Sequence, residues 1–168
     1  MPDPLSPYAV TKSAGENYCS VFSRLYGMLC ASLRYFNVFG PRQDPGSPYS
    51  GVITKFITNT LAHKPVTIFG DGKQTRDFVY VKDVVRANIL AMESSMSGVY
   101  NVARGSQMNL LELLEIIVDL SGIRVPVTFA SSASGDVWHS SADITLARNT
   151  LGYNPIYTVK TGFLETIA

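Results

Sequence analysis

A tyrosine and a lysine near the start of the chain have the spacing of an acid–base pair. Tyr8 and Lys12 are separated by one helical turn, so in a helix both side chains share one face, with Cβ atoms about 5–6 Å apart. A free phenol has a pKa of about 10, and a neighbouring ammonium lowers that pKa because it favours the phenolate. The pair could therefore move a proton near neutral pH, although a surface helix with an incidental tyrosine and lysine has the same pattern.

The residues around this pair predict a long helix and then a buried strand. Ser6 suits the N-cap, Pro7 suits the first helical position, and apolar residues recur with helical spacing as far as Gly27, a typical stop. Residues 28–36 form a mostly apolar run, which is typical of a strand covered on both faces in a parallel sheet. The loop 37–43 follows this strand, and ligands of open α/β sheets bind at the carboxyl ends of strands.

Shorter helices and strands alternate along the rest of the chain. The expected helices cover residues 52–61, 83–92, 110–120, 143–151 and a segment from about 158, and the expected strands cover 66–69, 75–81, 99–103 and 125–130. Asp83 and Asp143 are expected to cap their helices, and Asn109 and Glu112 have the spacing of a capping box. This order predicts an α/β fold that combines the last helix and strand of a Rossmann-like doubly wound sheet with a smaller α+β domain.

Length, composition and charge exclude several classes of protein. The chain has 168 residues, of which 46% are hydrophobic and 16% charged, and its net charge is +1; this argues against a disordered chain and against a nucleic-acid partner. The sequence has no apolar run long enough for a transmembrane helix and no signal-peptide pattern, so we expect a cytoplasmic protein without a membrane partner. Cys19 and Cys30 are predicted to be buried free thiols. His63 and His139 lack neighbours at metal-ligand spacing, so no metal site is expected.

Five motifs occur in the order and spacing of one protein family. They are Tyr8-Ala-Val-Thr-Lys12, Leu33-Arg-Tyr-Phe-Asn37-Val-Phe-Gly-Pro-Arg42-Gln, Phe69-Gly-Asp-Gly72, Thr75-Arg-Asp-Phe-Val-Tyr-Val81 with Asp83, and Gly135-Asp-Val with Ala142-Asp-Ile144. On these residues the chain resembles the carboxyl-terminal part of extended short-chain dehydrogenases/reductases. More narrowly, it resembles the NAD-dependent nucleotide-sugar epimerases of the UDP-glucose or UDP-N-acetylglucosamine 4-epimerase type. The resemblance implies that residues 1–43 are a remnant of the NAD-binding Rossmann domain and that residues 44–168 are mainly the nucleotide-sugar-binding domain.

The resemblance also implies a role for each site residue. Tyr8 would be the catalytic base that takes the proton of the sugar 4-hydroxyl while NAD accepts the hydride from C4, and Lys12 would hold the nicotinamide ribose. Tyr35 and Asn37 would line the cofactor, and Asn37 would also reach the nucleotide diphosphate. The other substrate contacts would be Val52, Thr67 and Phe69 around the nucleobase, Arg76 on the diphosphate, and Asp136 in the late loop.

Several of these residues have simpler alternatives. Asn37 could satisfy only the backbone of its own loop, and Arg76 could form a local ion pair with Asp77. Phe69 could belong to the core, and Tyr35 could likewise be packed there. The sequence leaves these alternatives open.

Parts that the family needs for turnover are expected to be absent from this chain. Its nearest approach to the glycine-rich dinucleotide fingerprint is Gly70-Asp-Gly72, which leads into a predicted strand and not into a helix. Ala133 stands where the family usually has a second phosphate-binding arginine. The amino-terminal dinucleotide-binding half is therefore expected to be absent, and the isolated chain is expected to be inactive.

The resemblance leaves alternatives for the function. The main hypothesis is the carboxyl-terminal portion of an NAD-dependent nucleotide-sugar 4-epimerase, with NAD as cofactor and a UDP-sugar as substrate. The alternatives are a portion of a nucleotide-sugar 4,6-dehydratase, or a non-catalytic remnant that binds a nucleotide sugar or only associates. Because the missing half would leave apolar surface exposed, a homodimer or another association is expected through the Tyr8–Lys12 helix and the exposed sheet edge.

Overall fold

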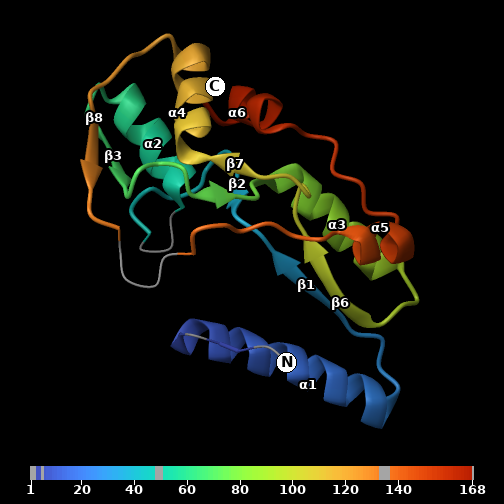
Figure 1. Ribbon diagram of the computed structural model, residues 1–168. Coiled ribbons are helices and arrows are strands. Elements are labelled where there is room, and N and C mark those ends of the chain that lie inside the picture. The colour runs from blue at the N-terminus through green and yellow to red at the C-terminus, as the bar shows by residue number, and fades with distance from the viewer. Residues whose placement is uncertain (1–2, 5, 48–50, 133–136, 168) are drawn as a thin grey trace.

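The computed structural model describes residues 3–4, 6–47, 51–132 and 137–167, which form an α/β fold with parallel strands (Figure 1). The helices are α1 (Pro7–Tyr26), α2 (Val52–Leu61), α3 (Val81–Glu93), α4 (Leu110–Ser121), α5 (Thr145–Leu151) and α6 (Val159–Ile167). The strands are β1 (Ala31–Tyr35), β2 (Val38–Phe39), β3 (Val66–Phe69), β4 (Thr75–Arg76), β5 (Val79–Tyr80), β6 (Gly98–Val102), β7 (Met108–Asn109) and β8 (Val127–Ala130). The predicted α/β class is confirmed.

Four pairs of strands connect segments that are far apart in the chain. β1 pairs with β6, β2 with β5 and β3 with β8, all in parallel, whereas β4 and β7 are antiparallel. In the first pair Ala31 lies opposite Gly98, and Tyr35 lies opposite Val102. Hydrogen bonds between β1 and β6 therefore cross the predicted domain division after residue 43, and that division stays a prediction.

Two clusters of buried side chains form the core. The first contains side chains from α2, β3, α4 and α6, including Ile53, Ile68, Leu113 and Phe163. The second contains side chains from α3, β6 and α5, including Val84, Val102 and Ala147. Because α1 contributes no buried residue, the long first helix stands outside both clusters.

The ends of α1 follow the predicted capping pattern. Ser6 Oγ accepts a hydrogen bond from the backbone N–H of Ala9 at 3.1 Å, and Gly27, with φ 65°, closes the helix. Figure 1 shows α1 running alongside β1, below the rest of the chain. Two hydrogen bonds of 2.6 Å join Arg34 of β1 to the carboxylate of Glu16 of α1, so an ion pair links the helix to the strand that follows it.

The predicted strand 75–81 is wrong as one element. β4 and β5 are separated by Asp77 and Phe78, and α3 begins at Val81. Asp77 is fully buried, and its carboxylate accepts the backbone N–H groups of residues 104–105, in the loop between β6 and β7. This long-range contact turns the backbone away from a continuous strand.

Asp83 does not cap α3. Tyr80 occupies the N-cap position, and Asp83 lies in the first helical turn. The buried carboxylate of Asp83 instead accepts the backbone N–H groups of Ile156 and Tyr157, each at 3.0 Å. Asp83 thus anchors the segment before α6, a role that the local sequence could not reveal.

Of the other two predicted caps, the one at α4 is present and the one at α5 is shifted by one residue. At α4, Asn109 Oδ1 accepts the N–H of Glu112 at 2.9 Å and Glu112 Oε2 accepts the N–H of Asn109 at 3.1 Å, which confirms the capping box. At α5 the N-cap position is Ile144, but Asp143 Oδ1 accepts the N–H of Thr145 at 2.8 Å.

The region around β1 is less buried than predicted. The strand begins at Ala31 and not at residue 28, and its residues Arg34 and Tyr35 are exposed. Cys19 and Cys30 are free thiols, but Cys19 is exposed and Cys30 is only half-buried. The reason is that α1 buries no residue and that, within the described part of the chain, β1 has a hydrogen-bonded neighbour on one side only.

Candidate functional site

A pocket of about 380 Å³ brings together most of the predicted substrate contacts. Five of them line it: Asn37, Val52, Thr67, Phe69 and Arg76. They come from the loop after β1, the start of α2, the strand β3 and the strand β4, and we term the cavity the Arg76 pocket. The sixth predicted contact, Asp136, and the substituted position Ala133 lie outside the described residues.

Strand β3 presents two of these side chains by simple alternation. Val66 and Ile68 are fully buried, whereas Thr67 and Phe69 point to the opposite side, as the two-residue period of a strand requires. Phe69 is 52% exposed. The alternative that Phe69 belongs to the core is therefore wrong, and its ring offers a stacking face at the pocket.

Asn37 is fixed by a strand distant in the sequence. Its Nδ2 donates to the backbone carbonyl of Asp77 at 2.9 Å, and its own carbonyl accepts the N–H of Val79 at 3.3 Å. The alternative that Asn37 only satisfies its own loop is therefore wrong. Because Asp77 follows Arg76 in the chain, the first of these bonds also fixes Asn37 beside the arginine.

Arg76 and Asp77 have different surroundings. Arg76 is half-buried, lines the pocket, and donates from Nη1 to the carbonyl of Thr75 at 2.9 Å. The two oxygens of Asp77 accept the N–H groups of Arg104 and Gly105, each at 2.9 Å, so the carboxylate binds backbone groups in place of the local ion pair. Burial raises the pKa of Asp77, and these N–H bonds offset part of the rise because they favour the charged form.

Tyr8 and Lys12 lie on one face of α1, as predicted. Lys12 Nζ is 5.3 Å from the centroid of the Tyr8 ring. Both residues line a hollow of about 530 Å³ that also includes Tyr35 and Arg34 of β1, and we term it the Tyr8 hollow. Tyr8 is 61% exposed, so a ligand can reach the phenol.

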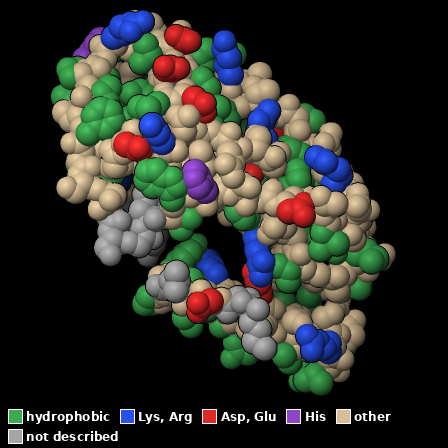
Figure 2. Space-filling model, in the orientation of Figure 1, with side chains coloured by type: hydrophobic (Ala, Val, Ile, Leu, Met, Phe, Trp, Pro, Cys, Tyr) green, Lys and Arg blue, Asp and Glu red, His purple; other side chains and the backbone are tan. Residues whose placement is uncertain are grey.

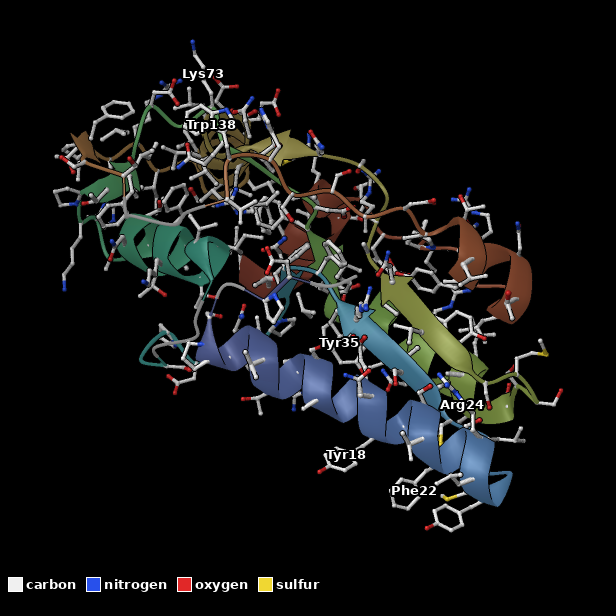
Figure 3. All side chains as sticks on the ribbon, turned by 60° about the horizontal axis from the view of Figure 1, so that its bottom comes forward. Tyr18, Phe22, Arg24, Tyr35, Lys73 and Trp138 are labelled. Atoms are coloured by element: carbon white, nitrogen blue, oxygen red, sulfur yellow. The ribbon has the colours of Figure 1, made fainter. Side chains whose placement is uncertain are left out.

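Tyr35 lies at the carboxyl end of β1 and lines the Tyr8 hollow. It is 50% exposed, and its hydroxyl donates to Asn88 Oδ1 of α3 at 2.9 Å. Figure 3 shows its side chain above α1, near the arrowhead of β1. The alternative that Tyr35 is packed in the core is therefore wrong.

The Arg76 pocket and the Tyr8 hollow are separate cavities in this structure. Asn37 and Arg76 line the pocket, whereas Tyr8, Lys12 and Tyr35 line the hollow. Figure 2 shows an open gap between the surface formed by α1 and the rest of the molecule. The residues predicted to contact the cofactor are thus divided, because Asn37 lies in the pocket and the other three lie in the hollow.

Two glutamines of the Arg76 pocket were not predicted from the sequence. Gln43 Oε1 accepts the hydroxyl of Thr54 at 2.7 Å, and Gln74 donates from Nε2 to the backbone carbonyl of Phe69. Both stand in loops, where periodicity does not distinguish them from surface polar residues. Gln43 is the last residue of the motif that begins at Leu33, and Gln74 directly precedes the motif that begins at Thr75, so these motifs were the nearby signals.

Among the described residues, no group of three or more His, Cys, Asp or Glu side chains lies close enough together to hold a metal ion. None of the described helices combines the length and the apolar character needed to cross a membrane. The expectations of no metal site and no membrane partner stay predictions.

The fold and the site define a class of α/β chains with parallel strands, a Tyr–Lys pair on one helix face and a pocket lined by arginine. Residues 1–103 match the model of the NAD dependent epimerase/dehydratase family. The chain belongs to this family, which confirms the resemblance found in its motifs at the level of the family.

Within this family, the chain is similar to several UDP-sugar 4-epimerases. The chain is 37% identical over 166 residues to the UDP-glucose 4-epimerase of Mycolicibacterium smegmatis, a match that covers 98% of this chain and 53% of that protein. The crystal structure of the Thermotoga maritima UDP-glucose 4-epimerase with UDP-glucose is similar with a TM-score of 0.95 and 39% identity, over 99% of this chain and 54% of the other. The UDP-glucuronic acid 4-epimerase of Bacillus cereus, solved with UDP-glucuronic acid and NAD, has a TM-score of 0.89 and 35% identity, over 99% and 53% of the two chains. The chain thus spans about half the length of the relatives it matches.

Proposed function

We propose that this chain is the carboxyl-terminal half of an NAD-dependent UDP-sugar 4-epimerase. The observation that carries the proposal is the convergence, on one pocket, of five residues assigned to the substrate by the resemblance. Relatives solved with UDP-glucose, or with UDP-glucuronic acid and NAD, support the choice of ligands.

In this proposal the Arg76 pocket holds the UDP part of the substrate. Phe69 offers an exposed ring on which a base can stack, and the Arg76 guanidinium presents N–H groups in fixed directions to phosphate oxygens. Asn37 adds an amide whose position is fixed by the bond to the Asp77 carbonyl. The volume of about 380 Å³ lies within the range of ordinary small-ligand pockets.

Tyr8 and Lys12 carry the proton transfer at the sugar. The Tyr8 phenolate removes the proton of the 4-hydroxyl, and the ammonium of Lys12, 5.3 Å from the ring centroid, stabilises the negative charge of the phenolate. NAD, when bound, supplies the hydride acceptor for C4 and later returns the hydride. After the 4-keto sugar has turned over, Tyr8 returns the proton to the oxygen at C4, which completes the inversion.

The described residues fit only one end of the cofactor. Tyr8 and Lys12 both open into the Tyr8 hollow, so they fit the nicotinamide ribose end. Gly70 and Gly72 have positive φ values, but their turn leads into β4 and so lacks the helix N-terminus that binds a pyrophosphate. We therefore propose that the isolated chain binds the UDP part of the substrate without turnover.

Self-association through α1 is part of the proposal. Tyr18, Phe22, Leu25 and Tyr26 of α1 are between 44% and 70% exposed, and the rings of Phe22 and Tyr26 have centroids 5.3 Å apart. Figure 3 shows Tyr18 and Phe22 pointing away from β1. A contiguous apolar patch of this kind is typical of an interface.

Sedimentation velocity tests the proposed self-association. It should show a dimer that Phe22→Lys converts to a monomer, and a monomeric parent chain would contradict self-association through α1.

A chimera tests the proposed reaction. The chain is joined behind the amino-terminal half of the Thermotoga maritima UDP-glucose 4-epimerase, and the inversion of UDP-glucose at C4 is measured with NAD present. We expect turnover by the chimera and none by the isolated chain. In the chimera, Tyr8→Phe should lower kcat by about 10²–10⁴-fold because the acid–base group is lost.

Tyr18→Phe is the matched control, since Tyr18 is an exposed tyrosine on the same helix that does not line the Tyr8 hollow. It should leave kcat unchanged. A folded chimera that binds UDP-glucose without turning it over, or a Tyr8→Phe chimera as fast as its parent, would contradict the proposed function.

A further inference from the structure

Two buried carboxylates have no part in the reaction proposed above. Among the described residues, Asp77 and Asp83 are the only charged side chains in the core, with exposed fractions of 0% and 1%. Each accepts at least two backbone N–H groups, at 2.9 Å for Asp77 and at 3.0 Å for Asp83. A buried charge is costly unless such bonds satisfy it, and bonds to a charged acceptor are stronger than bonds between neutral groups. Both carboxylates therefore hold the segments that they bind firmly in place.

The side chain of Asp77 is held outside the Arg76 pocket. Its two oxygens accept the N–H groups of Arg104 and Gly105, and Oδ2 also accepts the N–H of Ala142 at 3.4 Å. None of these residues lines the pocket, and Asp77 does not line it either. A ligand in the pocket therefore does not touch the carboxylate, and any effect of Asp77 on binding must pass through its neighbours.

The backbone of Asp77 connects this carboxylate to two polar side chains of the pocket. Arg76 precedes Asp77 in the chain, and Asn37 donates from Nδ2 to the Asp77 carbonyl at 2.9 Å. Both of these neighbours line the pocket. Asp83 differs, because neither Asp83 nor its N–H donors at residues 156–157 line the pocket. Of the two buried carboxylates, only that of Asp77 is joined directly to residues proposed to bind the substrate.

We propose that Asp77 is a positioning residue, whose carboxylate holds Arg76 and Asn37 in the arrangement that binds the diphosphate. This inference rests on the proposed function, which places UDP in the Arg76 pocket. An amide at position 77 could accept one of the two N–H groups, but its own NH₂ would face the other donor. Asp77→Asn should therefore displace the backbone at residue 77, and with it the guanidinium and the Asn37 amide.

The affinities of the isolated chain for UDP and for uridine separate this role from a general loss of stability. Calorimetry measures the affinity for UDP directly, and competition with UDP gives the affinity for uridine, which lacks the diphosphate. In Asp77→Asn the ratio of the two affinities should fall about tenfold, because the diphosphate loses an aligned partner.

Asp83→Asn is the matched control, because it changes the other buried carboxylate that accepts two backbone N–H groups. Both substitutions should lower the free energy of unfolding in urea, since each leaves a buried donor facing another donor. Asp83→Asn should nevertheless keep the parent ratio of the two affinities.

Hydrogen exchange resolved by NMR is a second measurement, which needs no variant in case Asp77→Asn does not fold. If the bonds of Asp77 favour UDP binding, bound UDP must strengthen those bonds in return, because coupling between two sites is reciprocal. UDP should therefore slow exchange at the N–H groups of residues 104–105 more than at residues 156–157, which donate to Asp83.

Two results would overturn the role of Asp77 and leave the proposed function standing, provided that the parent chain binds UDP. One is a ratio that Asp77→Asn lowers no more than Asp83→Asn does. The other is equal slowing of exchange at the two pairs of N–H groups. If the folded parent chain does not bind UDP, the proposed function and this inference both fail.

Discussion

The Arg76 pocket and the Tyr8 hollow are built in different ways. The pocket stands on packed elements, with Ile68 of β3 and Phe163 of α6 fully buried in the cluster around it. The hollow stands on α1, which buries no residue and is joined to β1 by the ion pair of Glu16 and Arg34. The residues proposed to bind the substrate therefore stand on a buried core, whereas those proposed to move the proton stand on a helix that buries no residue.

Truncation of one buried and one exposed apolar side chain should give the largest contrast between the regions. Phe163 is fully buried and packs edge-on against Phe39 with ring centroids 5.0 Å apart, whereas Val10 of α1 is 52% exposed and lies outside the proposed interface. Phe163→Ala should lower the free energy of unfolding by about 3–5 kcal/mol because it leaves a cavity, and Val10→Ala should change it by less than about 0.5 kcal/mol. Urea unfolding followed by circular dichroism measures both, and equal losses would remove the contrast.

Loss of the pocket's cation should give the next largest effect. Arg76→Met keeps much of the side-chain length but removes the donors for phosphate oxygens, so UDP binding should weaken by about 1.5–3 kcal/mol. Arg124→Met, at an exposed position that does not line the pocket, serves as the control and should leave the affinity unchanged. Calorimetry on the isolated chain measures both variants, and an unchanged affinity in Arg76→Met would show that the diphosphate does not lie in this pocket.

The ion pair under α1 should give the smallest effect. Arg34, which bonds to the carboxylate, lowers the pKa of Glu16. Because the folded pKa lies below the unfolded value of about 4.3, the pair stabilises the helix contact above that pH, and the contribution is lost as the pH falls through the folded pKa. Both side chains are partly exposed, so Glu16→Gln at pH 7 should cost only about 0.2–1 kcal/mol.

Hydrogen exchange read by mass spectrometry can resolve this small effect. Glu16→Gln should speed exchange in α1 and leave α4 unchanged, whereas Glu115→Gln, at an exposed position on α4, should affect neither helix. Equal acceleration in both helices would show that α1 and the packed core unfold as one unit.

Local sequence signals predicted the parts of the molecule that depend on neighbouring residues. The Ser6 cap, the capping box of Asn109 and Glu112, and the shared face of Tyr8 and Lys12 all depend on contacts within one or two helical turns. The family resemblance assigned five residues to the substrate, and the fold brings all five together in the Arg76 pocket.

The errors arose where distant contacts decide the structure. Asp77 and Asp83 bind backbone N–H groups far along the chain, at residues 104–105 and 156–157, and no local pattern contains that information. The expected burial of Cys19 assumed that α1 is covered, which the described residues do not achieve. Gln74 could not be identified from the sequence, because only the fold shows that its loop lines the Arg76 pocket.

Titration of the isolated chain with UDP and, separately, with NAD shows whether the Arg76 pocket binds the nucleotide and whether the Tyr8 hollow is incomplete. We expect saturable, stoichiometric binding of UDP that Arg76→Met weakens, together with no stoichiometric binding of NAD and no epimerase turnover. No heat with UDP from a folded chain would contradict the assignment of the Arg76 pocket. Stoichiometric NAD binding with turnover would contradict the claim that the Tyr8 hollow is only part of a catalytic site.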